Sequence, residues 1–277
     1  MARELRLRII SAIVLAAVVL IATWIGGWAF NLVAAVIAPL IYYEWSTITR
    51  LAEQDFKANA FGWLIVLLIA LDLAIGGGDL SMPLLCGGAI TAAILVLPGR
   101  GPWWIPGGII YAGLSGISLA AIRGDNQAGL VAMLFIFAVV WGTDILAYFV
   151  GRAIGGPKLA PRISPGKTWS GAIGGTVAGV AASGLLTLGV FSRLSLWTMA
   201  LAFLLSVASQ VGDLFESFIK RRFGVKDSSH LIPGHGGVMD RVDGLVFACF
   251  AVFLLTLVDT AMKGHVSNSV AAFLFGL

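Results

Sequence analysis

Apolar runs of about the length of a bilayer span alternate with short polar stretches along the chain. About 18 to 20 consecutive apolar residues in a helix cross the hydrocarbon core of a membrane, so these runs predict transmembrane helices. The predicted spans are residues 9–25, 28–45, 61–75, 82–97, 105–122, 129–150, 171–190, 195–219 and 242–262. The third is the weakest, because it is short and carries Asp72. The pattern predicts an all-α fold, a polytopic membrane bundle of about nine transmembrane helices.

The composition agrees with a membrane protein and excludes an ordinary soluble one. Of the 277 residues, 59% are hydrophobic and only 12% are charged, which is typical of chains embedded in lipid. No soluble domain of ordinary size fits between the spans, so we expect a single membrane domain over 1–277. Its predicted parts are helices one to five in 1–128, helices six to nine in 129–262 with loops 151–170 and 220–241, and a tail at 263–277.

The net charge of +4 does not indicate a nucleic-acid-binding protein, because the basic residues lie in short loops between spans. In that position they are explained by membrane topology and lipid phosphates. Of the 18 lysines and arginines, all but Arg123, Arg193 and Lys263 fall on one predicted face. The positive-inside rule places this face, with both long loops, in the cytoplasm. We expect a multi-pass protein of a bacterial-type inner membrane.

Polar residues recur at helical spacing along the span 195–219. They are Ser206, Ser209, Gln210, Asp213, Glu216, Ser217 and Lys220. Such a stripe cannot face lipid, and one interpretation is a hydrogen-bonded seam between helices. Two carboxylates on the stripe favour a functional site, because acids inside a membrane are costly unless they bind cations or each other.

Two acids outside this stripe, Asp144 and Asp240, are expected at about the depth of Asp213. Asp144 precedes Arg152 by eight residues and Asp213 precedes Lys220 by seven, so both lie roughly 10 Å below the membrane edge at 1.5 Å per residue. Asp240 stands at the entrance of the last span and is expected at or just above that layer, from the other direction. With Glu216 these acids predict a site for one or two divalent cations, and their oxygen ligands suit Mg²⁺.

Basic side chains surround the predicted acidic layer. They are Arg152, Lys158, Arg162, Lys167, Lys220, Arg221, Arg222, Lys226 and Arg241. Each one alone is explained by the positive-inside rule. Together with metal-binding acids they indicate phosphoryl or nucleotidyl transfer, in which cations stabilise charge on the transferring and leaving phosphates.

Two loop segments offer additional phosphate contacts. Glycines around His235, including Gly236 and Gly237, let backbone amides approach an anion, and the imidazole can donate to a phosphate oxygen. Lys167 and Thr168 are expected to contact phosphate in the other loop, although the segment is not a P-loop, which would need a glycine where Pro161 stands.

Small residues recur every four positions at Gly171, Gly175, Gly179 and Ser183. This pattern allows membrane helices to pack closely. We expect the span 171–190 to lie tight against 129–150 or 195–219.

The segment from Ser217 to Asp243 resembles the signature of the phosphatidate cytidylyltransferase, or CDP-diacylglycerol synthase, family. The residues at the family's spacing are Ser217, Lys220, Arg221, Lys226, Asp227, Pro233, His235, Gly236, Gly237, Asp240, Arg241 and Asp243, and upstream Asp144, Tyr148, Gly151, Arg152, Ser164, Pro165, Lys167, Thr168 and Gly171. The similarity covers about 140 to 245. One departure is Ser170, where the family usually has glutamate.

The resemblance implies an activity that composition and spacing do not name. In that family the phosphate of phosphatidic acid attacks the α-phosphorus of CTP, which gives CDP-diacylglycerol and pyrophosphate. The resemblance also implies Mg²⁺ dependence, catalysis on the cytoplasmic face and a homodimer, and it leaves room for a second cation such as K⁺.

The resemblance and the pattern together assign roles to individual residues. Asp213 and Asp240, aided by Asp144 and Glu216, are expected to bind the metal, with Asp213, Asp240, Lys167 and His235 as the catalytic set. The expected phosphate and substrate contacts are Arg152, Thr168, Ser217, Lys220, Arg221, Lys226, Gly236, Gly237 and Arg241.

Two alternative functions remain open at this point. The run Asp240-Arg241-Val242-Asp243-Gly244 is suggestive of a CDP-alcohol phosphotransferase, although Phe247 and Ala248 stand where that family has alanine and arginine. A cation- or proton-coupled transporter would use the intramembrane acids as a relay. A transporter leaves the glycine-rich loop and the clustered cations unexplained.

Overall fold

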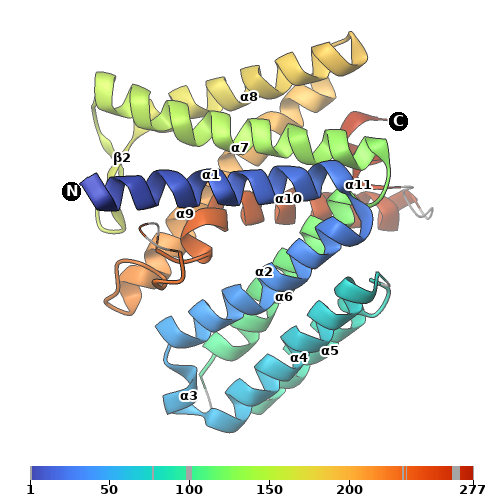
Figure 1. Ribbon diagram of the computed structural model, residues 1–277, viewed down its shortest axis with the longest axis vertical. Coiled ribbons are helices and arrows are strands. Elements are labelled where there is room, and N and C mark those ends of the chain that lie inside the picture. Colours follow the sequence, from blue (N-terminus) through green and yellow to red (C-terminus); the bar gives the residue numbers. More distant parts are fainter. Residues whose placement is uncertain are drawn as a thin grey trace. The chain divides into compact units, whose positions relative to one another are not determined.

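The computed structural model describes residues 2–76, 78–97, 102–232, 234, 236–263 and 269–276, with side chains described from residue 9 onward. Helices make up most of the described chain (Figure 1). They are α1 (Ala2–Ile25), α2 (Gly27–Ile48), α3 (Leu51–Gln54), α4 (Phe56–Ile75), α5 (Ser81–Val96), α6 (Trp104–Arg123), α7 (Gln127–Ile154), α8 (Trp169–Phe191), α9 (Leu196–Arg222), α10 (Met239–Lys263) and α11 (Val270–Phe275).

Each of the nine predicted spans falls on one of these helices. Among the described residues seven helices, namely α2, α4 and α6 to α10, are long and apolar enough to cross a membrane. The apolar parts of α1 and α5 are shorter, so the count of nine is approximate. The all-α membrane fold is confirmed, and the protein is an integral membrane protein.

The relative strength of the third span was predicted wrongly. Helix α4 has 20 residues, whereas its neighbour α5 has only 16. Asp72 in the last turns of α4 accepts a hydrogen bond of 2.6 Å from the Ser81 hydroxyl at the start of α5. The acid that appeared to weaken the span therefore joins the two helices.

The loop 151–170 contains a small hairpin that the sequence did not predict. Strand β1 (Lys158–Ala160) pairs antiparallel with β2 (Ser164–Thr168). The amide of Trp169, the first residue of α8, donates to the carbonyl of Pro157 at 3.0 Å and closes the hairpin at its base. The hairpin places Lys167 directly before α8.

The chain divides into two compact units. One contains residues 1–125 and 223–241, and the other contains 126–222 and 242–277. The expectation of a single membrane domain stays a prediction.

In the first unit, α2 packs against α4 and α6. Gly108 makes room for an aromatic side chain of α2, since a Cβ atom at this position would lie 2.6 Å from Cδ1 of Trp45. The indole of Trp45 donates to the carbonyl of Trp104 at 2.7 Å. Arg123, buried at the end of α6, donates to the carbonyls of Thr23 and Trp24 and so caps the end of α1.

In the second unit, α7 and α8 lie side by side through the small residues of α8 (Figure 1). A Cβ atom on Gly175 would lie 2.5 Å from the carbonyl oxygen of Thr143, and one on Gly171 would lie 2.7 Å from that of Ala147. Only glycine permits this approach of the two backbones. The predicted close packing against the span 129–150 is confirmed.

Candidate active site

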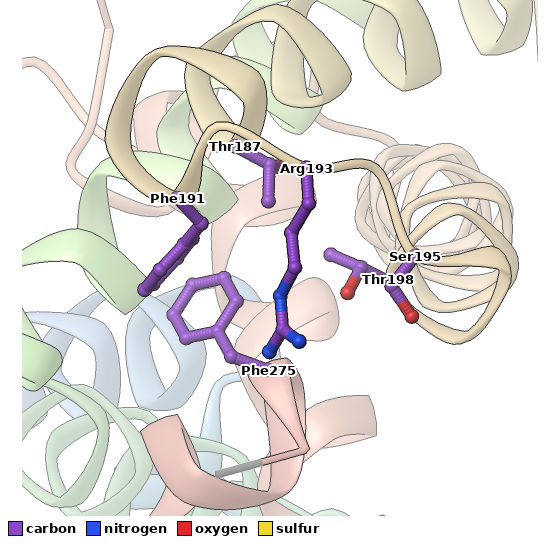
Figure 2. A pocket seen from close by; sticks show the side chains of 6 residues that line it. All are labelled: Thr187, Phe191, Arg193, Ser195, Thr198 and Phe275. Carbon is purple, nitrogen blue, oxygen red and sulfur yellow. The ribbon is translucent and has the colours of Figure 1, made fainter.

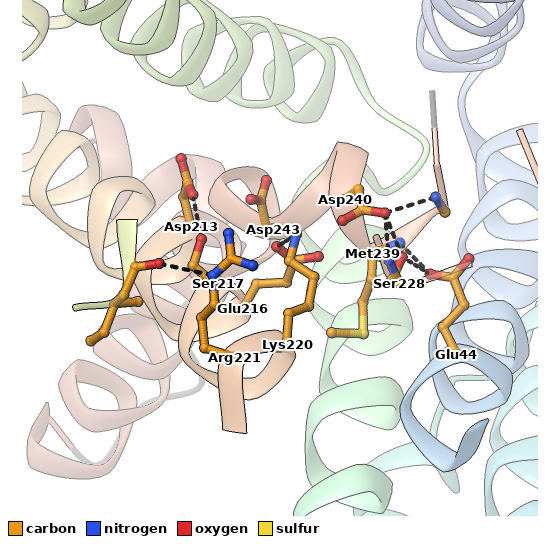
Figure 3. Close-up of polar contacts among 12 residues, drawn as sticks. Glu44, Asp213, Glu216, Ser217, Lys220, Arg221, Ser228, Met239, Asp240 and Asp243 are labelled. Carbon is orange, nitrogen blue, oxygen red and sulfur yellow. Dashed lines mark hydrogen bonds and ion pairs between the residues drawn. The ribbon is translucent and has the colours of Figure 1, made fainter. Parts of the chain in front are cut away.

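A lysine and a group of carboxylates meet in the second unit, near the hairpin. Lys167 forms an ion pair with Asp213 of α9. The Ser217 hydroxyl, one turn further along α9, donates to Oδ1 of Asp213 at 3.4 Å (Figure 3). The side chains of Lys167 and Asp213 remain 27% and 33% exposed. Asp213 is therefore held by neighbours and still reachable by a ligand.

Two more acids belong to this group. Asp144 of α7 and Asp243 of α10 lie near enough to Asp213 and Lys167 for their charges to interact. We name Asp144, Asp213 and Asp243 the acidic cluster. Asp243 is part of two sequence motifs but was assigned no role in the site, and its place three residues after Asp240 was the available signal.

Glycines explain why α9 and the part of α10 from residue 243 to 247 come close enough to form this cluster. A Cβ atom on Gly212 would lie 2.5 Å from the carbonyl oxygen of Asp243 and 2.7 Å from Cβ of Phe247. A Cβ atom on Gly244 would lie 3.2 Å from the carbonyl oxygen of Ser209. Each glycine is next to an acid of the cluster, so the close approach of the backbones brings the two carboxylates together.

Glu216 lies away from solvent and is paired within its own helix. Its side chain is only 1% exposed, and Oε2 lies 2.5 Å from Nζ of Lys220, four residues later. The predicted metal ligand and the predicted phosphate contact thus neutralise each other in this structure.

The acidic cluster fits Mg²⁺ by its chemistry. In the described part of the chain, no three carboxylate, histidine or cysteine side chains converge closely enough to hold a metal ion by themselves. Mg²⁺ needs no complete protein cage, because it is commonly bound by one or two carboxylates, water and substrate phosphates. The oxygen donors of Asp213 and its neighbours match that requirement.

In the first unit, Asp240 is the acceptor for a tight loop. Its Oδ2 accepts hydrogen bonds of 2.8 Å from the amide of Ser228, the hydroxyl of Ser228 and the amide of Gly237 (Figure 3). Gly236 has a φ of +83°, and a Cβ atom on it would lie 2.6 Å from the same oxygen. The anion that the Gly237 amide meets here is the protein's own carboxylate.

Sequence reasoning missed Glu44 of α2. This residue is fully buried, and its carboxylate accepts four hydrogen bonds from the segment 228–239. It is the single charge in the predicted span 28–45, and an acid inside an apolar span was the signal that was overlooked.

The predicted phosphate contacts have diverse surroundings. Lys226 and Arg241 are exposed. Arg152, also exposed, donates to the Tyr148 hydroxyl at 3.1 Å. Arg221 donates to the carbonyl of Ile163 at 3.5 Å, which links the end of α9 to the hairpin. His235 lies outside the described residues.

Thr168 and Ser170 attach the hairpin to the adjoining helices. Thr168 is buried, and its hydroxyl accepts the amide of Gly171 at 3.1 Å as the cap of α8. The Ser170 hydroxyl contacts that of Thr168 at 3.0 Å and donates to the carbonyl of Gly155, just after α7. The short serine side chain at position 170 thus joins the end of α7 to the start of α8.

A small pocket lies at the opposite end of α8 from Lys167. Its lining residues are Thr187, Phe191, Arg193, Ser195, Thr198 and Phe275 (Figure 2). Helix α8 has 23 residues, so at 1.5 Å per residue about 35 Å separates the pocket from the acidic cluster's end of the helix. The pocket contains none of the predicted site residues.

The fold and the site together define a class of protein. It is an all-helical, polytopic membrane protein with carboxylate and lysine side chains close together near the ends of its helices. The sequence profile of the cytidylyltransferase family matches residues 6–258. The chain therefore belongs to the cytidylyltransferase family.

The similarity to the following three proteins extends over nearly the whole chain. A phosphatidate cytidylyltransferase of Brucella abortus biovar 1 (strain 9-941) is 48% identical over 254 residues, covering 91% of this chain and 93% of the relative. A protein of the same name from Haemophilus influenzae is 34% identical over 295 residues, covering 91% and 100%. One from Pseudomonas aeruginosa is 35% identical over 259 residues, covering 88% and 94%.

Proposed function

We propose that this protein is a Mg²⁺-dependent phosphatidate cytidylyltransferase. It transfers CMP from CTP to phosphatidic acid and releases pyrophosphate. The observation that carries the proposal is the pairing of Lys167 with Asp213 beside two further carboxylates. The names and coverage of the relatives support the choice of substrates.

In the proposed reaction, an oxygen of the lipid phosphate forms a bond to the α-phosphorus of CTP. The bond between this phosphorus and the oxygen bridging to the β-phosphate breaks, and pyrophosphate leaves with the electron pair. The lipid phosphate is already anionic near neutral pH, so no strong general base is needed and positioning supplies much of the catalysis.

The residues of the second unit supply complementary charge. Asp213, with Asp144 and Asp243 beside it, would hold Mg²⁺, which neutralises charge on the triphosphate when bound. Lys167 would donate from its ammonium to a phosphate oxygen, and Arg221 at the end of α9 extends the positive surface. The predicted metal role of Asp240 and phosphate role of His235 belong to the same proposal.

The proposal includes orientation and assembly. The distribution of lysine and arginine supports a site on the cytoplasmic face of a bacterial inner membrane. The family resemblance supports a homodimer and leaves room for a second cation such as K⁺ near the acids.

The alternative functions are less favoured. The family match and the relatives' names support a cytidylyltransferase over a CDP-alcohol phosphotransferase or a transporter. A transporter would not require the basic side chains that accompany the acids.

Purified protein in detergent, given labelled CTP, phosphatidic acid and Mg²⁺, provides the test. Label should enter the lipid phase, and both EDTA and Asp213→Asn should abolish its transfer. The matched control is Asp259→Asn, because Asp259 is likewise paired with a lysine, Lys263, but lies near the end of α10 that is far from Asp243. Absence of transfer by the wild-type protein, or full transfer by Asp213→Asn, overturns the proposal.

A further inference from the structure

Glu44 joins α2 to a loop almost two hundred residues further along the chain. Its Oε1 accepts from the Ser229 hydroxyl at 2.6 Å and from the amide of Val238 at 2.7 Å. Its Oε2 accepts from the Ser228 hydroxyl at 2.9 Å and from the amide of Met239 at 2.7 Å. Each oxygen thus faces one hydroxyl and one backbone amide, and the single hydrogen of the Ser228 hydroxyl is shared between Glu44 and Asp240.

Because this carboxylate is buried, it requires the hydrogen bonds that the loop donates to it. Glu44 is 0% exposed, and a buried carboxylate is tolerated only when hydrogen bonds replace the lost water. The two amides can only donate, so they require acceptor oxygens at these positions. The ends of the segment 228–239 are thereby held to one side chain.

Ser228 connects this carboxylate to Asp240. Its hydroxyl lies 2.9 Å from Oε2 of Glu44 and 2.8 Å from Oδ2 of Asp240 (Figure 3). Gly237 lies against the Ser228 hydroxyl and the Glu44 carboxylate, because a Cβ atom at this position would collide with both. Glycine at position 237 of the signature is therefore required by the space that the buried carboxylate and the Ser228 hydroxyl occupy.

We propose that Glu44 is a positioning residue for the loop 226–241, which carries Lys226, Asp240 and Arg241. Resting on the proposed function, this inference means that Glu44 fixes the loop in the shape that binds the phosphates of CTP without touching the substrate. The loop lies in the part of the chain, 129–262, that contains all the predicted site residues, and it thus depends on a residue in the second predicted span.

Glu44→Gln is the most selective variant. Whichever way the new amide is turned, its NH₂ group faces the backbone amide of either Val238 or Met239. A serine hydroxyl can rotate to accept, but a backbone amide cannot, so one buried donor loses its acceptor. Tyr42→Phe is the matched control, because Tyr42 is equally buried on α2 and its hydroxyl bonds to Asn59 and not to the loop.

Two measurements on the full-length protein in detergent test the inference. Trypsin cleavage after the exposed Lys226, followed by mass spectrometry, should be about tenfold faster in Glu44→Gln, and the KM for CTP should rise about tenfold. Tyr42→Phe should match the wild type in both. A variant that merely folds less well would lower kcat per mole of protein and leave KM unchanged.

Wild-type cleavage and wild-type KM in Glu44→Gln overturn the inference. If that variant cannot be purified, Ser229→Ala removes only one donor to Oε1 and should show a smaller increase in both measurements, and no increase overturns it. If the wild-type protein transfers no label from CTP, the proposed function fails, while the cleavage rate still decides whether Glu44 holds the loop.

Discussion

Lys167 on the hairpin forms an ion pair with Asp213 in the middle of the polar stripe of α9. The lysine therefore offsets part of the negative charge of the acidic cluster. It also stands where an incoming phosphate would find both a cation and metal-binding oxygens.

Lys167→Gln should lower kcat/KM about 100-fold, because a single well-placed charge that stabilises a developing phosphate charge contributes this much. Initial rates of CTP-dependent lipid labelling measure the effect. The control is Lys263→Gln, which removes a lysine paired with Asp259 away from the cluster. Equal losses in the two variants would contradict a specific role for Lys167.

Asp243→Asn should lower activity about 10- to 100-fold, the range typical of residues that support a metal ligand from close by. The loss should be accompanied by a higher Mg²⁺ requirement, measured as the Mg²⁺ concentration for half-maximal rate. Asp259→Asn on the same helix should leave both quantities unchanged. An unaltered Mg²⁺ requirement in Asp243→Asn would exclude Asp243 from the cluster's metal-binding role.

Gly175→Ala should destabilise the second unit by about 1–3 kcal/mol, because the added methyl group would be forced against the Thr143 carbonyl. Thermal unfolding in detergent measures the change. Gly189→Ala is the control in the same helix, since a Cβ atom there meets nothing within 4 Å. That control should be neutral or stabilising by up to about 1 kcal/mol, the helix preference of alanine over glycine.

Ser170→Ala should cost about 0.5–1.5 kcal/mol, the usual contribution of a hydrogen bond between neutral groups. The Gly155 carbonyl loses its donor, so the hairpin should be cleaved faster by trypsin at Lys158 and Arg162. Limited proteolysis with mass spectrometry detects this cleavage. A hairpin as resistant as the wild type would show that Ser170 does not hold it.

The helices were predictable because lipid imposes length and hydropathy on every span, and the packing of α8 was predictable because small residues repeat at helical spacing. The hairpin was not, since the pairing of Lys158 with Thr168 and of Ala160 with Ser164 depends on the helices on either side bringing the two strands together. Glu44 was missed because hydrophobic pattern says nothing about partners 184 or more residues away in sequence. Asp213 and Lys167 could be chosen from charge, but their contact could not.

The glycine-lined contact of α7 and α8 also restricts the positions that Lys167 can occupy. The hairpin begins just after α7 and ends at the start of α8. Its two ends therefore cannot separate unless the two helices separate. A lysine on a free loop would have to find its partner anew in every catalytic cycle. Here folding already places Lys167 near Asp213. The hairpin therefore loses little conformational entropy when the substrate binds in each catalytic cycle.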